Sequence, residues 1–146
     1  MSRTKKAIIK LTGSSLAMFI ILVIIGSVVV DHSNPPVTYN GIKWDSPQTE
    51  DMMRHACYNC HSNETVWPWY SYIAPVAFLV SKDVQEGRST LNFSTGQGQM
   101  EPRNLARQIQ KGKMPPPIYL IMHPDANLTD QQKQDLIAGI HASTFR

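Results

Sequence analysis

Both cysteines of the chain fall in one pentapeptide, Cys57-Tyr-Asn-Cys60-His61. Cys-x-x-Cys-His is the attachment signature of c-type haem. Two thiols at this spacing can form thioethers with the two vinyl groups at one edge of a porphyrin, and the histidine that follows can then ligate the iron. The pentapeptide therefore predicts one covalent haem c, attached through Cys57 and Cys60 and ligated by His61.

Three other kinds of site also use paired cysteines. A structural disulfide is common in exported domains, and a thioredoxin-type redox pair requires a βαβ context. A zinc site usually takes four ligands, often with a second Cys or His pair at short spacing. The sequence shows neither a βαβ pattern around residue 57 nor a second pair. The histidine directly after the second cysteine favours haem over all three.

The sixth ligand of the iron has several candidates. Met114 stands in Gly-Lys-Met-Pro-Pro-Pro, where the prolines hold the backbone extended and stiff and so could fix the thioether sulfur. His123 precedes another proline and is the alternative sixth ligand, and an open sixth position is a third solution. The remaining candidates by residue type are Met100, Met122, His141 and, upstream, His55, which should point away from the iron. We predict Met114, although core packing is the usual role of a methionine.

An aromatic segment, Trp67-Pro-Trp-Tyr-Ser-Tyr72, follows the pentapeptide. Large rings can pack around a macrocycle, and the N–H or O–H of a Trp or Tyr can reach a haem propionate. We expect packing here, with Trp67 and Tyr70 as cofactor-binding residues and one polar tip on a propionate. Arg88 and Asn92 also carry suitable donors, and we predict that Arg88 contacts the cofactor.

Short helices must position these residues. Ser46 followed by Pro47 is typical of an N-cap and a first helical residue, and predicts a helix over residues 47–59 with the pentapeptide at its C-terminal end. Three more helices are predicted over residues 76–87, 102–111 and 129–141. Gly87 and Gly112 mark the ends of the first two, and Thr129 opens the last with Gln132 as its capping-box partner.

The fold class that follows is all-α. No strand alternation and no internal repeat is visible, so residues 47–146 should form a small cytochrome c-like helical domain around one haem. The cofactor itself can supply much of the core that about 100 residues otherwise struggle to build.

A stretch of twenty uncharged, mostly apolar residues covers positions 11–30. As a helix it spans roughly 30 Å, the thickness of a bilayer core. Cleaved signal peptides usually have a shorter apolar core and a small-x-small site, so we expect an uncleaved, single-pass signal anchor in the inner (cytoplasmic) membrane. The four basic residues that precede it place the tail 1–10 in the cytoplasm and the haem domain in the periplasm. They are Arg3, Lys5, Lys6 and Lys10.

Residues 31–46 are predicted to be a Pro-rich linker. From Asp31 onward ten basic residues face eleven acidic ones, so the pI near 9.0 reflects the N-terminal tail alone. A nucleic-acid partner would require a basic patch on the folded domain. We therefore expect membrane and redox-protein partners and no nucleic acid.

Five segments carry a resemblance to a known family. They are the stretch from Cys57 to Val76, Asp83-Val-Gln-Glu-Gly-Arg with Leu91-Asn-Phe-Ser, Gly112-Lys-Met-Pro-Pro, and His123-Pro-Asp-Ala-Asn-Leu-Thr. Over about residues 40–140 the chain resembles the bacterial "haem-binding domain" family of membrane-anchored c-type cytochrome-like proteins. The resemblance implies a membrane anchor and one covalent haem c, and it gives no reaction. The chain departs from the family at Thr95-Gly-Gln-Gly, where an acid and a tryptophan are usual.

Two functions fit these predictions. Iron with His and Met ligands is saturated, which suits single-electron transfer between membrane and periplasmic partners. The alternative is a haem-based ligand sensor or peroxidase-like protein with an open or displaceable sixth position. No further acid–base group beside the haem can be recognised, so we expect an electron carrier rather than an enzyme.

Overall fold

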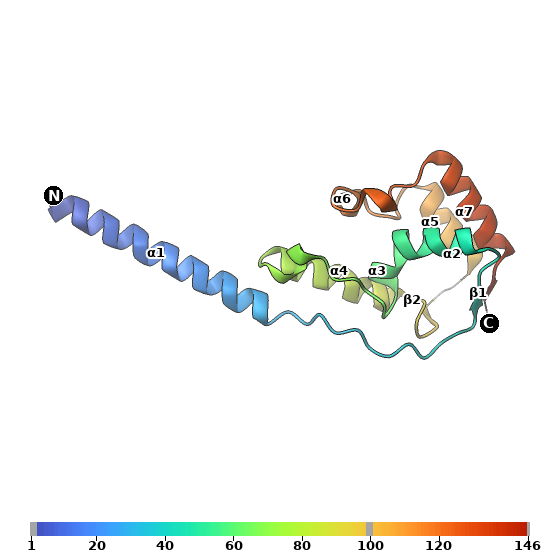
Figure 1. The fold of residues 1–146 in the computed structure, drawn as a ribbon, viewed down its shortest axis with the longest axis horizontal. Helices are drawn as coiled ribbons and strands as arrows, with labels where there is room; N and C mark the ends of the chain where they lie inside the picture. The colour runs from blue at the N-terminus through green and yellow to red at the C-terminus, as the bar shows by residue number, and fades with distance from the viewer. Residues whose placement is uncertain (1–2, 99–100, 146) are drawn as a thin grey trace. The chain divides into compact units, whose positions relative to one another are not determined.

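The computed structural model describes residues 3–98 and 101–145, and the described chain is mostly helical. Its longest helix, α1 (Arg3–Val28), stands out in Figure 1. Within it the segment Lys10–Val28 is long and apolar enough to cross a membrane. The hydroxyls of Ser15 and Ser27 donate to backbone carbonyls four residues earlier in the helix. These polar groups are therefore satisfied without water, as a membrane helix requires.

The chain divides into two compact units, which are described separately. The first combines Met1–His32 with Trp67–Lys82, and the second combines Ser33–Val66 with Asp83–Arg146. The first unit holds α1, the short helix η2 (Trp69–Tyr72) and the first turns of α4 (Val76–Thr90).

The second unit begins its helical part with α2 (Pro47–Met53), η1 (Arg54–Tyr58) and α3 (Asn59–His61), which follow one another without a break. The backbone N–H of Thr49 donates to the Ser46 side chain at 3.2 Å, which confirms the predicted N-cap. The helical run ends at His61, two residues later than predicted. Its middle part is a wide π turn, a form that is often found at functional sites.

Helix α4 corrects one prediction. It continues through Gly87 to Thr90, so this glycine does not end the helix. The chain then forms a small antiparallel pair from β2 (Leu91–Asn92) and β3 (Gln97–Gly98). A second pair joins β1 (Ile42–Lys43) to β4 (Thr144–Phe145). Each strand has only two residues, which is too short for side-chain alternation to show in the sequence.

The remaining helices follow the predicted boundaries closely. Helix α5 (Pro102–Gln110) ends just before Gly112, whose φ of 60° is the left-handed conformation that favours glycine after a helix. Helix α7 (Asp130–Ala142) begins with the predicted capping box, in which Thr129 and Gln132 exchange hydrogen bonds. Between them lie α6 (Pro117–Leu120) and η3 (Pro124–Ala126).

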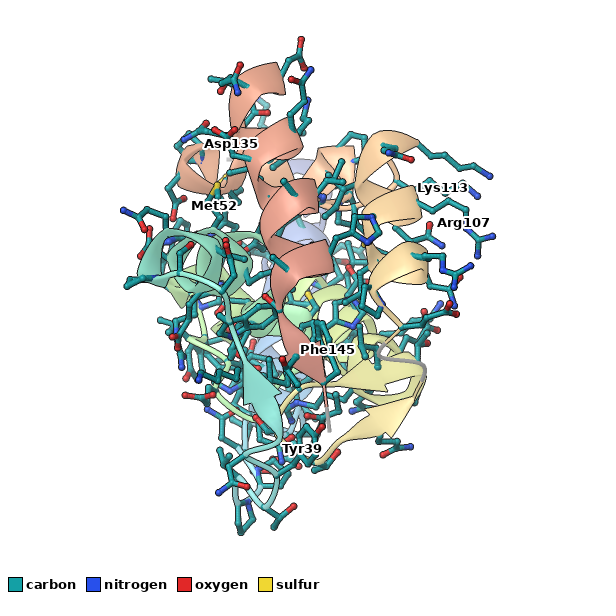
Figure 2. All side chains as sticks on the ribbon, turned by 90° about the vertical axis from the view of Figure 1, so that its right-hand side faces the viewer. Tyr39, Met52, Arg107, Lys113, Asp135 and Phe145 are labelled. Atoms are coloured by element: carbon teal, nitrogen blue, oxygen red, sulfur yellow. The ribbon has the colours of Figure 1, made fainter. Side chains whose placement is uncertain are left out.

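Helices α5 and α7 lie side by side and cover the core of the second unit (Figure 1). Leu136 and Ile140 of α7 are fully buried. The core residues are Met53, Ala56, Tyr58, Leu91, Phe93, Ile109, Leu128, Leu136 and Ile140. Figure 2 shows Arg107 and Lys113 extending outward, away from α7. This core supports the helical run that carries the pentapeptide.

Candidate haem site

His61 is held in one orientation by two backbone carbonyl groups. Its Nδ1 lies 3.0 Å from the carbonyl oxygen of Gly87 and 3.1 Å from that of Leu91. Carbonyl oxygens only accept hydrogen bonds, so Nδ1 is the donor in both contacts and Nε2 is the ring nitrogen left for a metal. Metal-binding histidines are typically fixed in this way, with the second ring nitrogen donating to a carbonyl or carboxylate. The ring is therefore prepared to ligate a metal through Nε2.

Gly87 allows α4 to approach the pentapeptide closely. A Cβ atom at this position would lie 2.9 Å from the carbonyl carbon of Cys60 and 3.0 Å from its Cβ. These separations leave no room for a side chain, so only glycine fits. The glycine that appeared to end a helix thus brings the Gly87 and Leu91 carbonyls within reach of His61.

Two adjoining cavities open beside the pentapeptide, with volumes of about 550 Å³ and 260 Å³. Cofactor sites in proteins commonly range from about 300 to 1,000 Å³. The residues that line both cavities are Ala56, Cys57, His61, Thr90 and Met114. Cys60 lines the smaller cavity, and apolar side chains including Leu105 and Ile109 line the larger one. The structure thus brings the two cysteines, His61 and Met114 together around one largely apolar space.

Two thiols, an imidazole and a thioether can attach a haem c and ligate its iron, and apolar walls suit the porphyrin. A third cavity of about 530 Å³, lined by residues such as Lys43, Asp45 and Glu50, includes neither cysteine nor His61. The cavities beside the pentapeptide are therefore the ones whose chemistry fits a haem.

The surroundings of the two thiols raise their pKa values, which is the opposite of what a reactive cysteine pair needs. Burial, with a smaller contribution from Cys60, raises the pKa of the Cys57 thiol to about 12. Burial and the nearby Asp83 carboxylate raise the pKa of Cys60 to about 11. Reactive cysteines instead have lowered pKa values, because the thiolate is the nucleophile.

A zinc site also finds no support within the described residues. No three His, Cys, Asp or Glu side chains gather there in a way that could hold a metal ion. Structural zinc sites take four such ligands. Of the uses of paired cysteines considered for this sequence, haem attachment fits the surroundings of Cys57 and Cys60 best.

A hydrogen bond that the sequence did not suggest ties the pentapeptide to α6. The Asn59 amide donates to the Tyr119 hydroxyl at 2.8 Å, and its oxygen accepts the Val66 backbone N–H at 3.0 Å. Tyr119 also lines the smaller cavity. The bond holds the segment after the prolines, and so the region of Met114, against the helical run. No periodicity or motif marks a pair sixty positions apart.

The other candidates for the sixth ligand lie elsewhere. His123 stacks on the Tyr119 ring with centroids 4.0 Å apart, and it lines neither cavity. His55 is exposed and lies 3.5 Å from the Asp51 carboxylate, as expected for a surface residue. Met122 and His141 are exposed, and Met100 lies outside the described residues. Among the candidates in the described part of the chain, Met114 is the one that faces the cavities.

Trp67 and Tyr70 belong to the first compact unit and do not line the two cavities. The Trp67 ring meets His32 edge-on at 4.8 Å, and Tyr70 meets Trp69 at 5.9 Å. The Trp67 indole N–H is buried and has no acceptor among the described residues. A contact of these two residues with the cofactor stays a prediction.

Arg88 also lines neither cavity. Its guanidinium donates to the Ser62 carbonyl at 2.8 Å, to the Asn34 side chain at 2.7 Å and to the Thr65 hydroxyl at 2.9 Å. These bonds tie α4 to the segments before and after the helical run. Asn92 is likewise buried and donates to the Asn63 side chain at 2.9 Å. Their predicted contact with a propionate stays a prediction.

Comparison with known proteins agrees with this chemistry. The family described as "Haem-binding domain" matches residues 20–142 of the chain. No curated protein and no solved structure matches this chain. Since the family match covers most of the sequence, including every residue around the two cavities, the chain belongs to the haem-binding domain family.

Proposed function

We propose that the chain is a membrane-tethered monohaem c-type cytochrome that carries single electrons between membrane and periplasmic redox partners. The observation that carries this proposal is the fixed orientation of His61 at the end of a Cys-x-x-Cys-His segment. Its Nδ1 donates to the carbonyl groups of Gly87 and Leu91. Bound haem supplies an iron that takes up and releases one electron at a time.

The residues around the cavities have separate tasks in this proposal. Cys57 and Cys60 would hold the porphyrin covalently, and His61 would bind the iron through Nε2. Met114 would be the second iron ligand, which is supported by its place beside His61 in the lining of both cavities. An iron with both ligands keeps no free position for a small molecule, which favours electron transfer over sensing or peroxide chemistry.

The apolar walls would limit the access of water to a bound iron. Met53, Leu105 and Ile109 line the larger cavity, and Met53 and Ile109 are buried. A dry shell around a metal influences its reduction potential, because charge is poorly solvated there. A Met114 thioether bound to the iron would raise the potential further relative to a second histidine.

The tether is α1. Its apolar segment Lys10–Val28 has the length of a membrane span, and the four basic residues lie on its N-terminal side. By the positive-inside rule the haem domain then lies outside the cytoplasm, where c-type haem is normally attached. An N-terminal anchor keeps the carrier close to redox partners in the same membrane.

A test begins with purified full-length protein. We expect a haem that survives denaturing electrophoresis and gives the pyridine haemochrome spectrum of haem c, and we expect it to be lost when both Cys57 and Cys60 are replaced by Ala. The reduced protein is then exposed to carbon monoxide. A closed His/Met site binds it slowly with little change in the Soret band, whereas rapid binding with a large shift would favour the sensor or peroxidase-like alternative.

A further inference from the structure

The first compact unit exposes a group of large apolar side chains. Six residues between positions 69 and 79 are 40% to 70% exposed: Trp69, Tyr72, Ile73, Val76, Phe78 and Leu79. The surrounding segment, residues 67–81, contains no Asp, Glu, Lys or Arg. An uncharged, aromatic-rich patch of this kind is uncommon on a surface that faces only water, and indicates an interaction site. We call these six residues the aromatic patch.

The aromatic patch is joined to the end of the membrane span. A Cβ atom at Gly26 would lie 2.9 Å from the Ala74 Cβ and 3.1 Å from the Phe78 ring, so α1 packs closely against this segment. The backbone N–H of Ala74 donates to the Ser27 hydroxyl at 3.0 Å. Gly26 and Ser27 are among the last residues of the span Lys10–Val28. The patch therefore lies beside the C-terminal end of the possible membrane span.

His32 fastens the chain to the same segment directly after the span. Its Nε2 lies 2.7 Å from the Ser71 carbonyl oxygen and its Nδ1 lies 3.0 Å from that of Val30. The imidazole stacks on the Tyr72 ring at 4.1 Å and meets Trp67 edge-on. Together with the packing at Gly26, these contacts fix the position of residues 67–74 along the axis of α1.

The exposed side of α4 changes character along the helix. In its first turn the exposed residues are apolar: Val76, Phe78 and Leu79. From Lys82 onward the exposed positions are charged or polar, beginning with Lys82, Asp83, Gln85 and Glu86. The buried stripe consists of small residues such as Ala77 and Ser81. A helix in water alternates polar and apolar faces around its axis, whereas this change along the axis matches a boundary between lipid and water.

We propose that the aromatic patch is a second membrane contact, seated in the interfacial layer of the outer leaflet beside the end of α1. The partner is lipid, because Trp and Tyr favour the headgroup region and the segment carries no charge that would select an acidic protein or an anionic surface. The proposal rests on the membrane tether of the proposed function. It implies that the protein is held at the bilayer at two places rather than by a flexible tether alone.

Lipid cross-linking tests this inference on the full-length, haem-loaded protein. The protein is reconstituted in phosphatidylcholine vesicles with a photoactivatable diazirine in the upper acyl chain, and labelled peptides are mapped by mass spectrometry. We expect labels in α1 and in residues 69–79. The double variant Trp69→Ser with Leu79→Ser should lower the labelling of this segment several-fold. The haem content of the protein should not change, because both side chains are exposed.

A matched control comes from α6 and the residue after it. Ile118 and Ile121 are also exposed and apolar, but they belong to the second compact unit. Ile118→Ser with Ile121→Ser should leave the labelling of residues 69–79 unchanged.

The possible outcomes distinguish a failure of the second membrane contact from a failure of the α1 tether. Labelled α1 with unlabelled residues 69–79 would overturn the second contact and leave the tether intact. Absence of label from both would overturn the tether itself. Unlabelled residues 69–79 in a full-length protein that sediments as a dimer would show that a second copy of the chain covers the patch, and would also overturn the proposal. The haem chemistry is judged separately, by the carbon monoxide experiment.

Discussion

Met114 and His61 come from segments 53 positions apart and line the same two cavities. If the Met114 sulfur is an iron ligand, Met114→Ala should abolish the weak far-red sulfur-to-iron absorption band and lower the reduction potential. Carbon monoxide should then bind rapidly, because one iron position becomes free. The covalent haem content should not change, since Cys57 and Cys60 still hold the porphyrin. Absorption spectra and a potentiometric titration measure these effects.

Met122 provides the control for this experiment. It lies in the same region of the chain, is half exposed and lines neither cavity, so Met122→Ala should leave the spectrum and the potential as they are. An original protein without the far-red band, in which His123→Ala rather than Met114→Ala allows rapid carbon monoxide binding, would identify His123 as the sixth ligand instead.

The hydrogen bond between Asn59 and Tyr119 joins the pentapeptide to the segment after Met114. A neutral hydrogen bond of this kind contributes about 1 kcal/mol to stability. In a double-mutant cycle, Asn59→Ala and Tyr119→Phe should therefore show a coupling energy of about 0.5 to 1.5 kcal/mol in denaturant unfolding. Additive effects of the two substitutions would mean that the bond does not stabilise the folded protein.

Among individual residues, the sequence predicted relations between close neighbours in the chain. Cys57, Cys60 and His61 are adjacent in one motif, so a shared role for them can be predicted without a structure. Gly87 and Tyr119 act through contacts with residues 27 and 60 positions away, Cys60 and Asn59. Such pairs are selected by packing in three dimensions, and no spacing rule reports them.

At the scale of elements, α4 and the helical run meet at Gly87. An exposed helix interior gains about 1 kcal/mol of stability when Ala replaces Gly. Here the new methyl group would collide with the Cys60 backbone, and overpacking of this kind costs about 1 to 3 kcal/mol. We therefore expect Gly87→Ala to lower the free energy of unfolding and to weaken the carbonyl contacts of His61.

Ser89 is the matched control on the same helix. It is exposed near the end of α4, and Ser89→Ala should change the free energy of unfolding by less than about 0.5 kcal/mol. Denaturant unfolding of both variants measures these changes in the free energy of unfolding. A Gly87→Ala protein that is more stable than the original would show that α4 does not approach Cys60 closely.

Helix starts were easier to predict than helix ends. Ser46 and Thr129 cap their helices through bonds to residues three positions later, so the signal is contained in a few neighbouring residues. The end of α4 depends instead on where β2 pairs with β3 and on how Gly87 packs, both of which are non-local. The two-residue strands escaped prediction because alternation needs a longer stretch to be recognisable.

For the whole molecule, the sequence predicted a span and a haem domain joined by a linker. The structure adds contacts that cross large sequence distances within the first unit, such as His32 with Ser71 and Ser27 with Ala74. A hydropathy pattern predicts that α1 can cross a bilayer but carries no information on what packs against its end. The aromatic patch therefore appeared in the sequence only as a cluster of rings beside the pentapeptide, and its position became clear from the packing.

The last prediction concerns the orientation of the whole chain in the membrane. The N-terminal tail holds four basic residues, and Lys43 is the first basic residue after the span. If these charges keep the tail in the cytoplasm, replacing all four by Gln should leave the orientation poorly specified. Part of the protein would then expose the pentapeptide to the cytoplasm, where c-type haem is not normally attached. We expect a clear fall in covalent haem per protein, measured by haem staining against immunoblot signal.

The charge-preserving variant Lys5→Arg, Lys6→Arg and Lys10→Arg separates charge from residue identity. It keeps the positive tail and should retain the full haem content, because the positive-inside rule depends on Lys and Arg alike. Full haem content in the Gln variant would show that something other than the tail orients the chain. The packing of α1 against residues 74 and 78 would then be the first feature to examine, because it couples the end of the span to the segment that follows the haem signature.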